Sequence, residues 1–235
     1  MTPEQFKEGY DRFVQQEGRS TKRFALNWDL KFPILDNDKY TSFEFPRDYI
    51  YLTGWAARVL KKINPSYHHD FASSLYFISM VSAWLPIKFC DYRRCSLQLD
   101  NLTCAEEDLR SLSFADNSLG SVSCLHVLEH IGLGRYGDEI DYDGDLKAIR
   151  ELKRVVRPGG HLLLAVPVGR TAAVCFNAHR IYGFREFITL FDDGFELIED
   201  VLIPESPLVG LVPNPPEDLL VAQRMACGCY WFRKR

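Results

Sequence analysis

Residues 144–167 read GDLKAIRELKRVVRPGGHLLLAVP, and this stretch decides the fold of the chain. Its first half, from about Gly144 to Val156, has the spacing of a helix that buries one face. The apolar side chains of that face are Leu146, Ile149, Leu152 and Val156. Arg157-Pro-Gly-Gly160 then stops the helix, and the apolar run His161–Val166 follows at once. Such a run is typical of a strand that is buried on both faces of a parallel sheet.

The alternation of helices and strands extends in both directions from this stretch. Upstream we expect strands over 68–71, 87–91, 102–105 and 121–125. Downstream we expect a helix over 185–191 and strands over 196–202 and 228–232. Because strands that alternate with helices form a parallel sheet, the sequence predicts an α/β domain.

The residues before this pattern have a different character. A chain of 235 residues is long enough for one well-filled α/β domain with some added segments. We expect residues 1–64 to form an N-terminal helical or irregular extension, with helices over 3–17 and 49–63. The α/β domain then occupies residues 65–235.

Charge and hydropathy exclude two classes of partner. A formal net charge of −4 provides no broad positive field for phosphate backbones, so no nucleic-acid substrate is expected. The longest apolar run, 75–89, is shorter than the ~20 residues of a membrane span and contains Pro86 and Lys88, so no span is expected. The first residues lack the apolar stretch of a signal peptide, which favours a cytoplasmic location.

The seven cysteines are spread over the expected strands, as is typical of reduced cysteines in a protein core. Cys227 and Cys229 form a close pair. We favour a pair on one strand over a metal or redox role, because no second Cys or His pair follows at ligand spacing. His68 and His69 would point to opposite faces of a strand, so they are not expected to share an ion.

Acidic residues follow the predicted strands at the edge where a parallel sheet binds its ligands. Asp91 ends the second strand, and Glu107 and Asp108 follow the third. Carboxylates there suit the ribose hydroxyls and adenine amine of NAD or of S-adenosylmethionine. A dinucleotide site also needs a Gly-x-Gly-x-x-Gly turn after its first strand. Because residues 70–74 contain no glycine, NAD is disfavoured.

Several strings of the sequence resemble a known class of protein. DLRSLSFADNS (108–118), SVSCLHVLEH (121–130) and ELKRVVRPGG (151–160) are similar, in order and spacing, to the middle motifs of class I methyltransferases. HIGLGRYGD (130–138), GDLKA (144–148) and FNAHRIY (176–182) resemble a methyltransferase-like family known only as domain-of-unknown-function family 268. The resemblance covers about Phe43 to the C-terminus.

This resemblance implies a Rossmann-like three-layer sandwich with a seven-stranded, mostly parallel sheet. The last strand, Cys227–Arg233, would be antiparallel, and residues 65–235 would be a class I methyltransferase-like domain. The expected cofactor is S-adenosylmethionine as methyl donor, without a metal. Carried over residue by residue, the cofactor site comprises Asp70, Ser73 and Ser74 at the methionine end, Asp91 at the ribose, Asp108 and the Leu109 backbone at the adenine, and His126 beside the sulfonium.

Two histidines are candidates for the base of a methyl transfer. The reaction requires alignment of the nucleophile with the sulfonium, and a base when the nucleophile is a hydroxyl. His130 follows the fourth strand, although Glu129 and His130 could equally brace the loop. His179 follows the fifth strand, and a helix-capping or loop-bracing role is its alternative.

Arg135 and Asp138 lie in a glycine-rich loop whose backbone could bend tightly around a substrate. The alternative is a turn in which Arg135 pairs with Asp138 or Asp141.

The favoured hypothesis is an S-adenosylmethionine-dependent methyltransferase that methylates an oxygen of a small molecule or of a sugar or glycan. A catalytically inactive relative, used for binding or regulation, is the alternative that the missing glycines in 70–74 motivate. A nicotinamide oxidoreductase is a third hypothesis, which predicts binding of NAD or NADP.

Overall fold

The computed structural model describes residues 2–17, 28–30 and 46–235, and the chain divides into two compact units, Met1–Phe45 and Pro46–Arg235. The first unit contains helix α1 (Pro3–Glu17), as predicted, and the short helix η1 (Trp28–Leu30). The Trp28 ring lies 4.8 Å from the ring of Tyr10 and 6.0 Å from that of Phe6, measured between centroids. These aromatic contacts join the two helices of the first unit.

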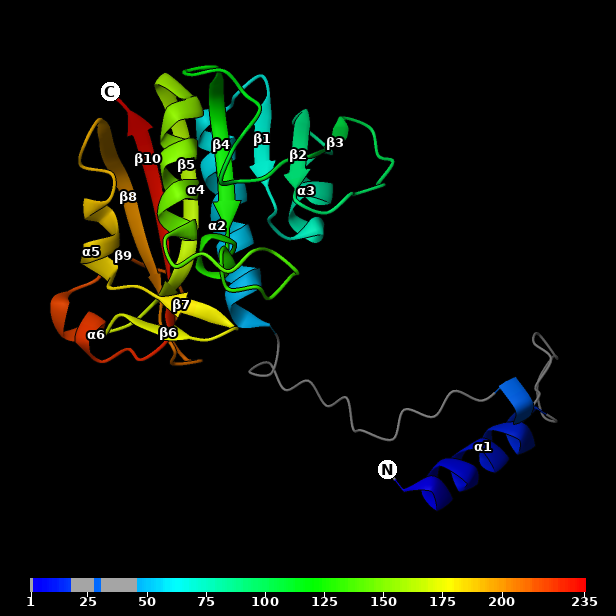
Figure 1. The fold of residues 1–235 in the computed structure, drawn as a ribbon. Coiled ribbons are helices and arrows are strands. Elements are labelled where there is room, and N and C mark those ends of the chain that lie inside the picture. Colours follow the sequence, from blue (N-terminus) through cyan, green and yellow to red (C-terminus); the bar gives the residue numbers. More distant parts are fainter. Residues whose placement is uncertain (1, 18–27, 31–45) are drawn as a thin grey trace. The chain divides into compact units, whose positions relative to one another are not determined.

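The second unit is built on a sheet with the strand order β3-β2-β1-β4-β5-β10-β8-β9 (Figure 1). The bounds of its strands are β1 His68–Phe71, β2 Ile87–Asp91, β3 Leu102–Glu106, β4 Leu119–Leu125, β5 Val156–Val168, β8 Phe195–Ile203, β9 Val212–Pro213 and β10 Ala226–Lys234. Strands β1 to β5 are parallel, and β10 runs antiparallel to both β5 and β8. The Rossmann-like α/β fold with an antiparallel last strand is therefore confirmed, but the sheet has eight strands and the predicted number of seven is wrong. The additional strand is β9, a pair of residues inside a proline-rich loop.

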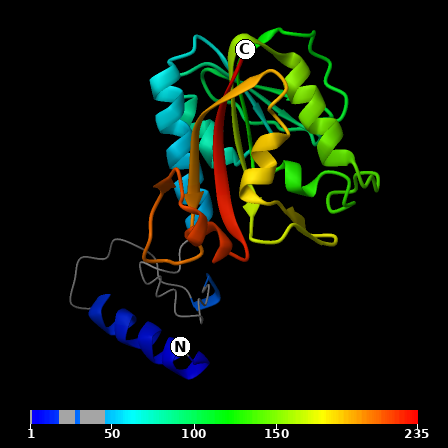
Figure 2. The same ribbon diagram turned by 90° about the vertical axis from the view of Figure 1, so that its left-hand side faces the viewer.

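Helices cover both faces of this sheet, which gives three layers (Figure 2). Helices α2 (Arg47–Ile63) and α3 (Leu75–Val81) share one apolar cluster with one face of the sheet. Helices α4 (Gly144–Val155) and α5 (Phe184–Thr189) share a second cluster with the other face. The remaining elements are η2 (Leu128–His130), α6 (Glu217–Val221) and the hairpin of β6 (Ala173–Cys175) and β7 (His179–Ile181).

The central strand β5 shows why its sequence is apolar at successive positions. Leu162, Leu164 and Val166 belong to the cluster under α4, whereas Leu163 and Ala165 belong to the cluster under α2. Successive strand residues point to opposite faces, so a strand covered on both sides needs apolar residues throughout.

Helix α4 buries a face slightly different from the predicted one. Ala148, Ile149, Leu152 and Val155 are buried, whereas Leu146 is 37% exposed. Leu146 lies in the first turn of the helix, near the end of the sheet, where less apolar surface is available to cover it.

Helix α2 lies within the second compact unit, although the sequence analysis assigned its residues to the extension. Its buried face includes Leu52, Trp55 and Val59, and Nε1 of Trp55 donates to Glu199 of β8 at 2.8 Å. At its first residue, Arg47 donates to the carbonyls of Pro204 and Val209 in the proline-rich loop. The loop is thereby held against the start of α2.

Over the part of the chain that the structure describes, no helix is long and apolar enough to cross a membrane.

The core contains a tyrosine whose hydroxyl can be tested directly. Tyr230 is wholly buried, and its hydroxyl donates to the carbonyl of Phe184 at 3.0 Å. We predict that Tyr230→Phe lowers the free energy of unfolding by about 1 kcal/mol, because the buried carbonyl loses its donor. Urea unfolding measures the change. Tyr76→Phe is the matched control, because Tyr76 is 83% exposed, and an equal loss in both variants would contradict the assignment.

Candidate functional site

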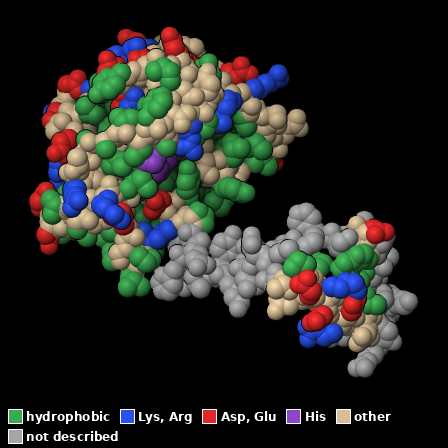
Figure 3. All heavy atoms as spheres, turned by 60° about the horizontal axis from the view of Figure 1, so that its bottom comes forward, with side chains coloured by type: hydrophobic (Ala, Val, Ile, Leu, Met, Phe, Trp, Pro, Cys, Tyr) green, Lys and Arg blue, Asp and Glu red, His purple; other side chains and the backbone are tan. Residues whose placement is uncertain are grey.

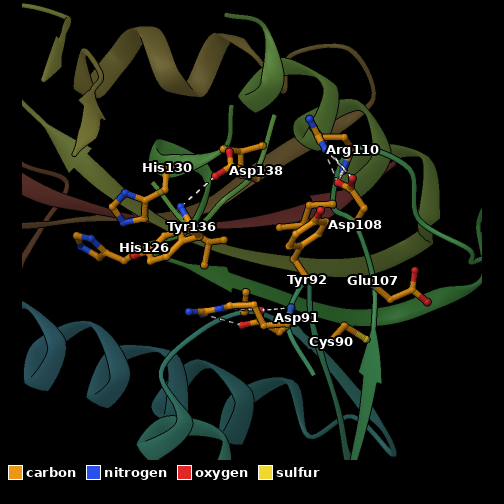
Figure 4. Close-up of a pocket in the computed structure, with 15 residues that line it drawn as sticks. Cys90, Asp91, Tyr92, Glu107, Asp108, Arg110, His126, His130, Tyr136 and Asp138 are labelled. Atoms are coloured by element: carbon orange, nitrogen blue, oxygen red, sulfur yellow. Dashed lines mark hydrogen bonds and ion pairs between the residues drawn. The ribbon is translucent and has the colours of Figure 1, made fainter. Parts of the chain in front are cut away.

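A cleft opens at the carboxyl ends of β1 to β4, where the strand order reverses between β1 and β4. The space within it and at its mouth, including space open to solvent, is about 740 Å³. Figure 3 views this edge of the molecule, and histidine side chains are visible among apolar and charged ones. The lining residues are Ala72, Cys90, Asp91, Tyr92, Arg93, Glu107, Asp108, Leu109, Arg110, His126, Val127, His130, Ile131, Tyr136 and Asp138. In Figure 4, His126 and His130 lie toward one end of the cleft and Asp108 with Arg110 toward the other.

The turn after β1 meets the cleft through Ala72, and not through the predicted serines. Ala72 has a φ of 57°, the left-handed conformation that favours glycine. Ser73 is buried, and its hydroxyl accepts a hydrogen bond from the amide of Leu125 at 3.0 Å. Ser74 precedes the first residue of α3. Asp70, Ser73 and Ser74, predicted at the methionine end of the cofactor, are therefore not among the lining residues.

Asp70 instead belongs to a buried polar chain between β1 and β4. Its carboxylate accepts from the amide of Ser73 at 3.0 Å and from the hydroxyl of Ser123. The Ser123 hydroxyl also lies 2.8 Å from Nε2 of His68, whose Nδ1 lies 2.7 Å from the Ser121 hydroxyl. Burial raises the pKa of Asp70 to about 6 and lowers that of His68 to about 3. His68 is therefore a neutral core residue at neutral pH.

Asp91 lies where the sequence predicts the ribose site, but its carboxylate has a partner within the chain. One oxygen accepts from the backbone amide and from Nε of Arg93, at 2.8 and 3.2 Å. The other accepts from Nη2 of Arg93 at 3.3 Å. The Arg93 guanidinium also lies 4.9 Å from the centre of the Tyr136 ring. A ligand hydroxyl at Asp91 would therefore share or displace the arginine.

Asp108 repeats this arrangement at the end of β3. Its carboxylate accepts from the Arg110 backbone amide at 2.8 Å and from Nη2 of Arg110 at 2.9 Å. The hydrogen bonds with Arg110 lower the pKa of Asp108, so the carboxylate is ionised at neutral pH. Leu109 lines the cleft beside it, as predicted for the adenine end.

His126 forms one end of the cleft and is fixed from two sides. Its Nδ1 lies 2.9 Å from Oε1 of Glu129, and its Nε2 lies 3.2 Å from Sγ of Cys227 in β10. Burial by itself would lower the pKa of His126, but Cys227 and Glu129 raise it well above 6.5. Its φ of 58° is in the left-handed region.

His130 lies in the cleft with a defined tautomer. Its Nδ1 lies 2.6 Å from the carbonyl oxygen of Ala178, and because a carbonyl only accepts, Nδ1 carries the hydrogen. Burial lowers the pKa of His130, against the opposing charge of Glu129. Arg135 donates to the same carbonyl at 3.0 Å but is not among the lining residues.

Asp138 holds the loop 131–142 in shape through hydrogen bonds with backbone amides of the same loop. Its carboxylate accepts from the amides of Gly132 and Tyr136, at 2.8 and 3.2 Å. Gly132 has a φ of 81°, and a Cβ there would lie 2.1 Å from the Asp141 carbonyl oxygen, so only glycine fits. Asp138 lines the cleft, but its hydrogen bonds brace the loop. These hydrogen bonds, and not the predicted alternative of an ion pair with Arg135, hold Asp138 in place.

Predicted site residues thus divide into two groups. The structure brings together Asp91, Asp108, Leu109, His126, His130 and Asp138 at one cleft, and places Asp70, Ser73, Ser74, Arg135 and His179 outside its lining. His179 lies on β7, with a buried Nε2 that has no hydrogen-bond partner.

Sequence reasoning missed Ala72, Arg93 and Arg110 as lining residues. The repeated pattern Asp-x-Arg after β2 and β3 is the signal that could have identified the two arginines.

A switch-point cleft in a three-layer sheet with an antiparallel last strand defines the class I, Rossmann-like methyltransferase fold. Residues 106–203 match the family described as "Caenorhabditis protein of unknown function, DUF268". The match covers less than half of the chain and agrees with the resemblance of residues 130–182 to this family.

Solved methyltransferase structures share this fold. A possible histamine N-methyltransferase of Thermotoga maritima is 14% identical, with a TM-score of 0.54 over 96% of this chain and 98% of that chain. The N-methyltransferase NodS of Bradyrhizobium japonicum, in complex with S-adenosylhomocysteine, is 15% identical, with a TM-score of 0.53 over 85% and 93%. A putative sarcosine dimethylglycine methyltransferase of Galdieria sulphuraria is 12% identical, with a TM-score of 0.55 over 79% and 86%. No curated protein sequence matches the chain.

The pH dependence of stability tests the buried position of Asp70. Its raised pKa means that Asp70 contributes stability below pH 3.8 that is lost as the pH rises through about 6. His68 has the opposite sign, because its lowered pKa gives stability above pH 6.5 that is lost as the pH falls toward about 3. Comparison of the wild type with Asp70→Asn cancels most of the His68 contribution.

We predict that Asp70→Asn gains stability relative to the wild type as the pH rises from about 4 to about 7, by on the order of 3 kcal/mol. Urea unfolding across this range measures the difference. Asp100→Asn, at an exposed position, should show no such trend. A parallel pH dependence of Asp70→Asn and the wild type would contradict the buried, proton-retaining carboxyl.

Proposed function

We propose that the protein is an S-adenosylmethionine-dependent methyltransferase that methylates an oxygen of a small molecule or of a sugar or glycan. The observation that carries this proposal is the pair of carboxylates, Asp91 and Asp108, at the carboxyl ends of neighbouring strands in one cleft. Their spacing along the edge suits the ribose and the adenine of one adenosyl group. The bound S-adenosylhomocysteine of a protein with the same fold gives further support.

The residues present fit this cofactor. Each carboxylate has about four acceptor positions, and Oδ2 of Asp91 accepts only from Arg93 among the described residues, so capacity remains for a ribose hydroxyl. Asp108 and the Leu109 backbone would hold the adenine. Ala72, in the conformation that favours glycine, would bring its backbone close to the methionine end. His126 would border the sulfonium.

S-adenosylmethionine would supply an electrophilic methyl group and leave as S-adenosylhomocysteine. We assign His130 as the base that serves the acceptor. Because its Nδ1–H donates to Ala178, its Nε2 carries the lone pair. Nε2 of His130 would take up the hydroxyl proton of the acceptor as its oxygen bonds to the methyl group, and the sulfur would keep the electron pair of the broken carbon–sulfur bond. A hydroxyl acceptor needs such a base, since it is not ionised at neutral pH.

An oxygen acceptor of small size suits the acceptor end of the cleft. Tyr136 is 45% exposed, and its ring lies 5.7 Å from that of His130, measured between centroids, so it presents aromatic surface there. Rings of this kind pack against the apolar face of a sugar while their hydroxyls reach its polar groups. The net negative charge of the chain argues against a polyanionic acceptor.

A catalytically inactive binding or regulatory protein is the second candidate function. It is favoured by the inward orientation of Asp70 and Ser73, whose polar groups are used within the core. A nicotinamide oxidoreductase has less support, because the turn after β1 holds no glycine to admit a pyrophosphate.

Calorimetry with S-adenosylmethionine, S-adenosylhomocysteine and NAD separates these functions. We predict binding of both adenosyl sulfur compounds and no binding of NAD. Asp91→Ala should weaken binding of S-adenosylhomocysteine by roughly tenfold or more, because the ribose loses a charged acceptor. Arg93→Ala is the matched control, and it should bind at least as tightly as the wild type, because it frees the carboxylate. Equal affinity of Asp91→Ala and the wild type would refute the site.

The base is tested by transfer of a labelled methyl group to a panel of monosaccharides and glycosides. We predict that His130→Gln binds S-adenosylhomocysteine normally but slows transfer by about 10²–10⁴-fold, because the hydroxyl proton has no acceptor. His161→Gln, on β5 away from the cleft, should transfer at the wild-type rate. Unchanged transfer by His130→Gln would remove His130 from the reaction.

A further inference from the structure

Glu129 is a wholly buried carboxylate beside the cleft that none of the assigned roles uses. It is the middle residue of η2 and has no exposed surface. Oε1 lies 2.9 Å from Nδ1 of His126 and 3.7 Å from Nε2 of His130. Neither carboxylate oxygen has a hydrogen-bond partner among the described residues, so the two imidazoles contact Glu129 at ion-pair distance only. An isolated carboxylate in such a site is costly, so Glu129 requires a positive partner.

His126 is suited to be that permanent partner. Both of its ring nitrogens are engaged, Nδ1 with Glu129 and Nε2 with the sulfur of Cys227. An imidazolium donates from both nitrogens, and these two neighbours can both accept. The Tyr49 ring, 5.6 Å away between centroids, further encloses His126. The Glu129–His126 contact is therefore a buried ion pair whose two charges cancel.

The ring of His130 differs from that of His126 because only its Nδ1 has a fixed partner. Its Nδ1–H is committed to the Ala178 carbonyl, so Nε2 is a lone pair in the neutral form. When Nε2 takes up a proton, Oε1 of Glu129 lies within ion-pair distance of it. The carboxylate of Glu129 thus faces two imidazoles. The ring of His126 is already charged, and the ring of His130 becomes charged when it accepts a proton.

Other ionisable groups around this cluster come from several elements. Asp48 of α2 interacts electrostatically with His126, and Tyr49 of α2 and Tyr182 interact with Glu129. Cys229 lies 3.9 Å from Cys227, measured between sulfurs. Nη1 of Arg135 lies 3.5 Å from Nδ1 of His130 and opposes its protonation. His126 opposes it too, so a charged His126 helps to keep His130 neutral.

We propose that Glu129 is the positioning residue of the cleft, which holds His126 as a fixed imidazolium and leaves His130 as the neutral proton acceptor. The role of His130 in transfer rests on the proposed function, whereas the protonation states do not. Two like groups whose surroundings separate their pKa values take different acid–base roles. Here the carboxylate of Glu129, which both rings share, separates the pKa values of His126 and His130.

Nuclear magnetic resonance of the ¹⁵N-labelled histidine rings tests the proposal in the full chain without any cofactor. Assignment uses single substitutions of the six histidines. In the wild type, we expect His126 to titrate well above pH 6.5 with both nitrogens protonated, and His130 to titrate below it as the Nδ1–H tautomer. In Glu129→Gln, both pKa values should fall, because the carboxylate charge that raises them is removed. Glu129→Asp, which keeps the charge, should retain a raised His126 pKa.

Glu107→Gln is the matched control, because Glu107 lines the same cleft but accepts its hydrogen bonds from Ser113. It should leave both histidine titrations unchanged. A neutral His126 at pH 7 in the wild type overturns the proposal without any variant. Unchanged titrations in Glu129→Gln overturn it as well, as would selective broadening of both rings by Mn²⁺, which would make Glu129 a metal ligand. If no methyl transfer is found but the titrations follow the expected pattern, only the proposed function fails.

Discussion

The register of β1 against β4 is the constraint on which the site depends. Asp70 lies opposite Ser123 in this parallel pair, and the chain from His68 through Ser123 to Asp70 joins the two strands within the core. Because a slip of one residue would turn each side chain to the other face, this polar chain fixes the register where the strand order reverses. Ser73 extends it to the Leu125 amide, directly before His126. The backbone of Ala72 and the ring of His126 are thereby set on the same edge of the sheet.

Two of the acids that line the cleft are each paired with an arginine two residues later. Asp91 pairs with Arg93, and Asp108 pairs with Arg110. The arginines hold these carboxylates in place, and a ligand at Asp91 would share or displace Arg93. Arg93 additionally contacts the Tyr136 ring, which connects the end of β2 to the loop 131–142 across the cleft. One guanidinium thus contacts both the proposed ribose site at Asp91 and the loop that borders the proposed acceptor site.

Much of this architecture could be predicted from local sequence patterns. Strands β1 and β2 have the predicted bounds, and α4 ends one residue from its predicted end, because apolar spacing is a local signal. Strand β5 already begins at Val156, so the Pro-Gly-Gly segment lies within this strand and not in a turn before it. Asp91 and Asp108 were predicted because strand ends define the ligand edge. The inward turn of Ser73 could not be predicted, since its partner amide is 52 residues away along the chain. Glu129 was foreseen only as a brace for its loop, because its burial depends on how α4, β5 and β7 pack against η2. The two-residue strand β9 has no periodicity to detect.

Strand β10 follows every other strand in the chain, yet it lies inside the sheet, between β5 and β8. Until β10 is added, β8 has only the short β9 as a neighbour, and Cys227 is not beside His126. The sheet is therefore complete only when this interior strand has paired with both of its neighbours. Until then the cleft lacks the contact that anchors His126. A chain in which β10 has not paired therefore also has an incomplete cleft. Ligand binding at the cleft then depends on completion of the sheet.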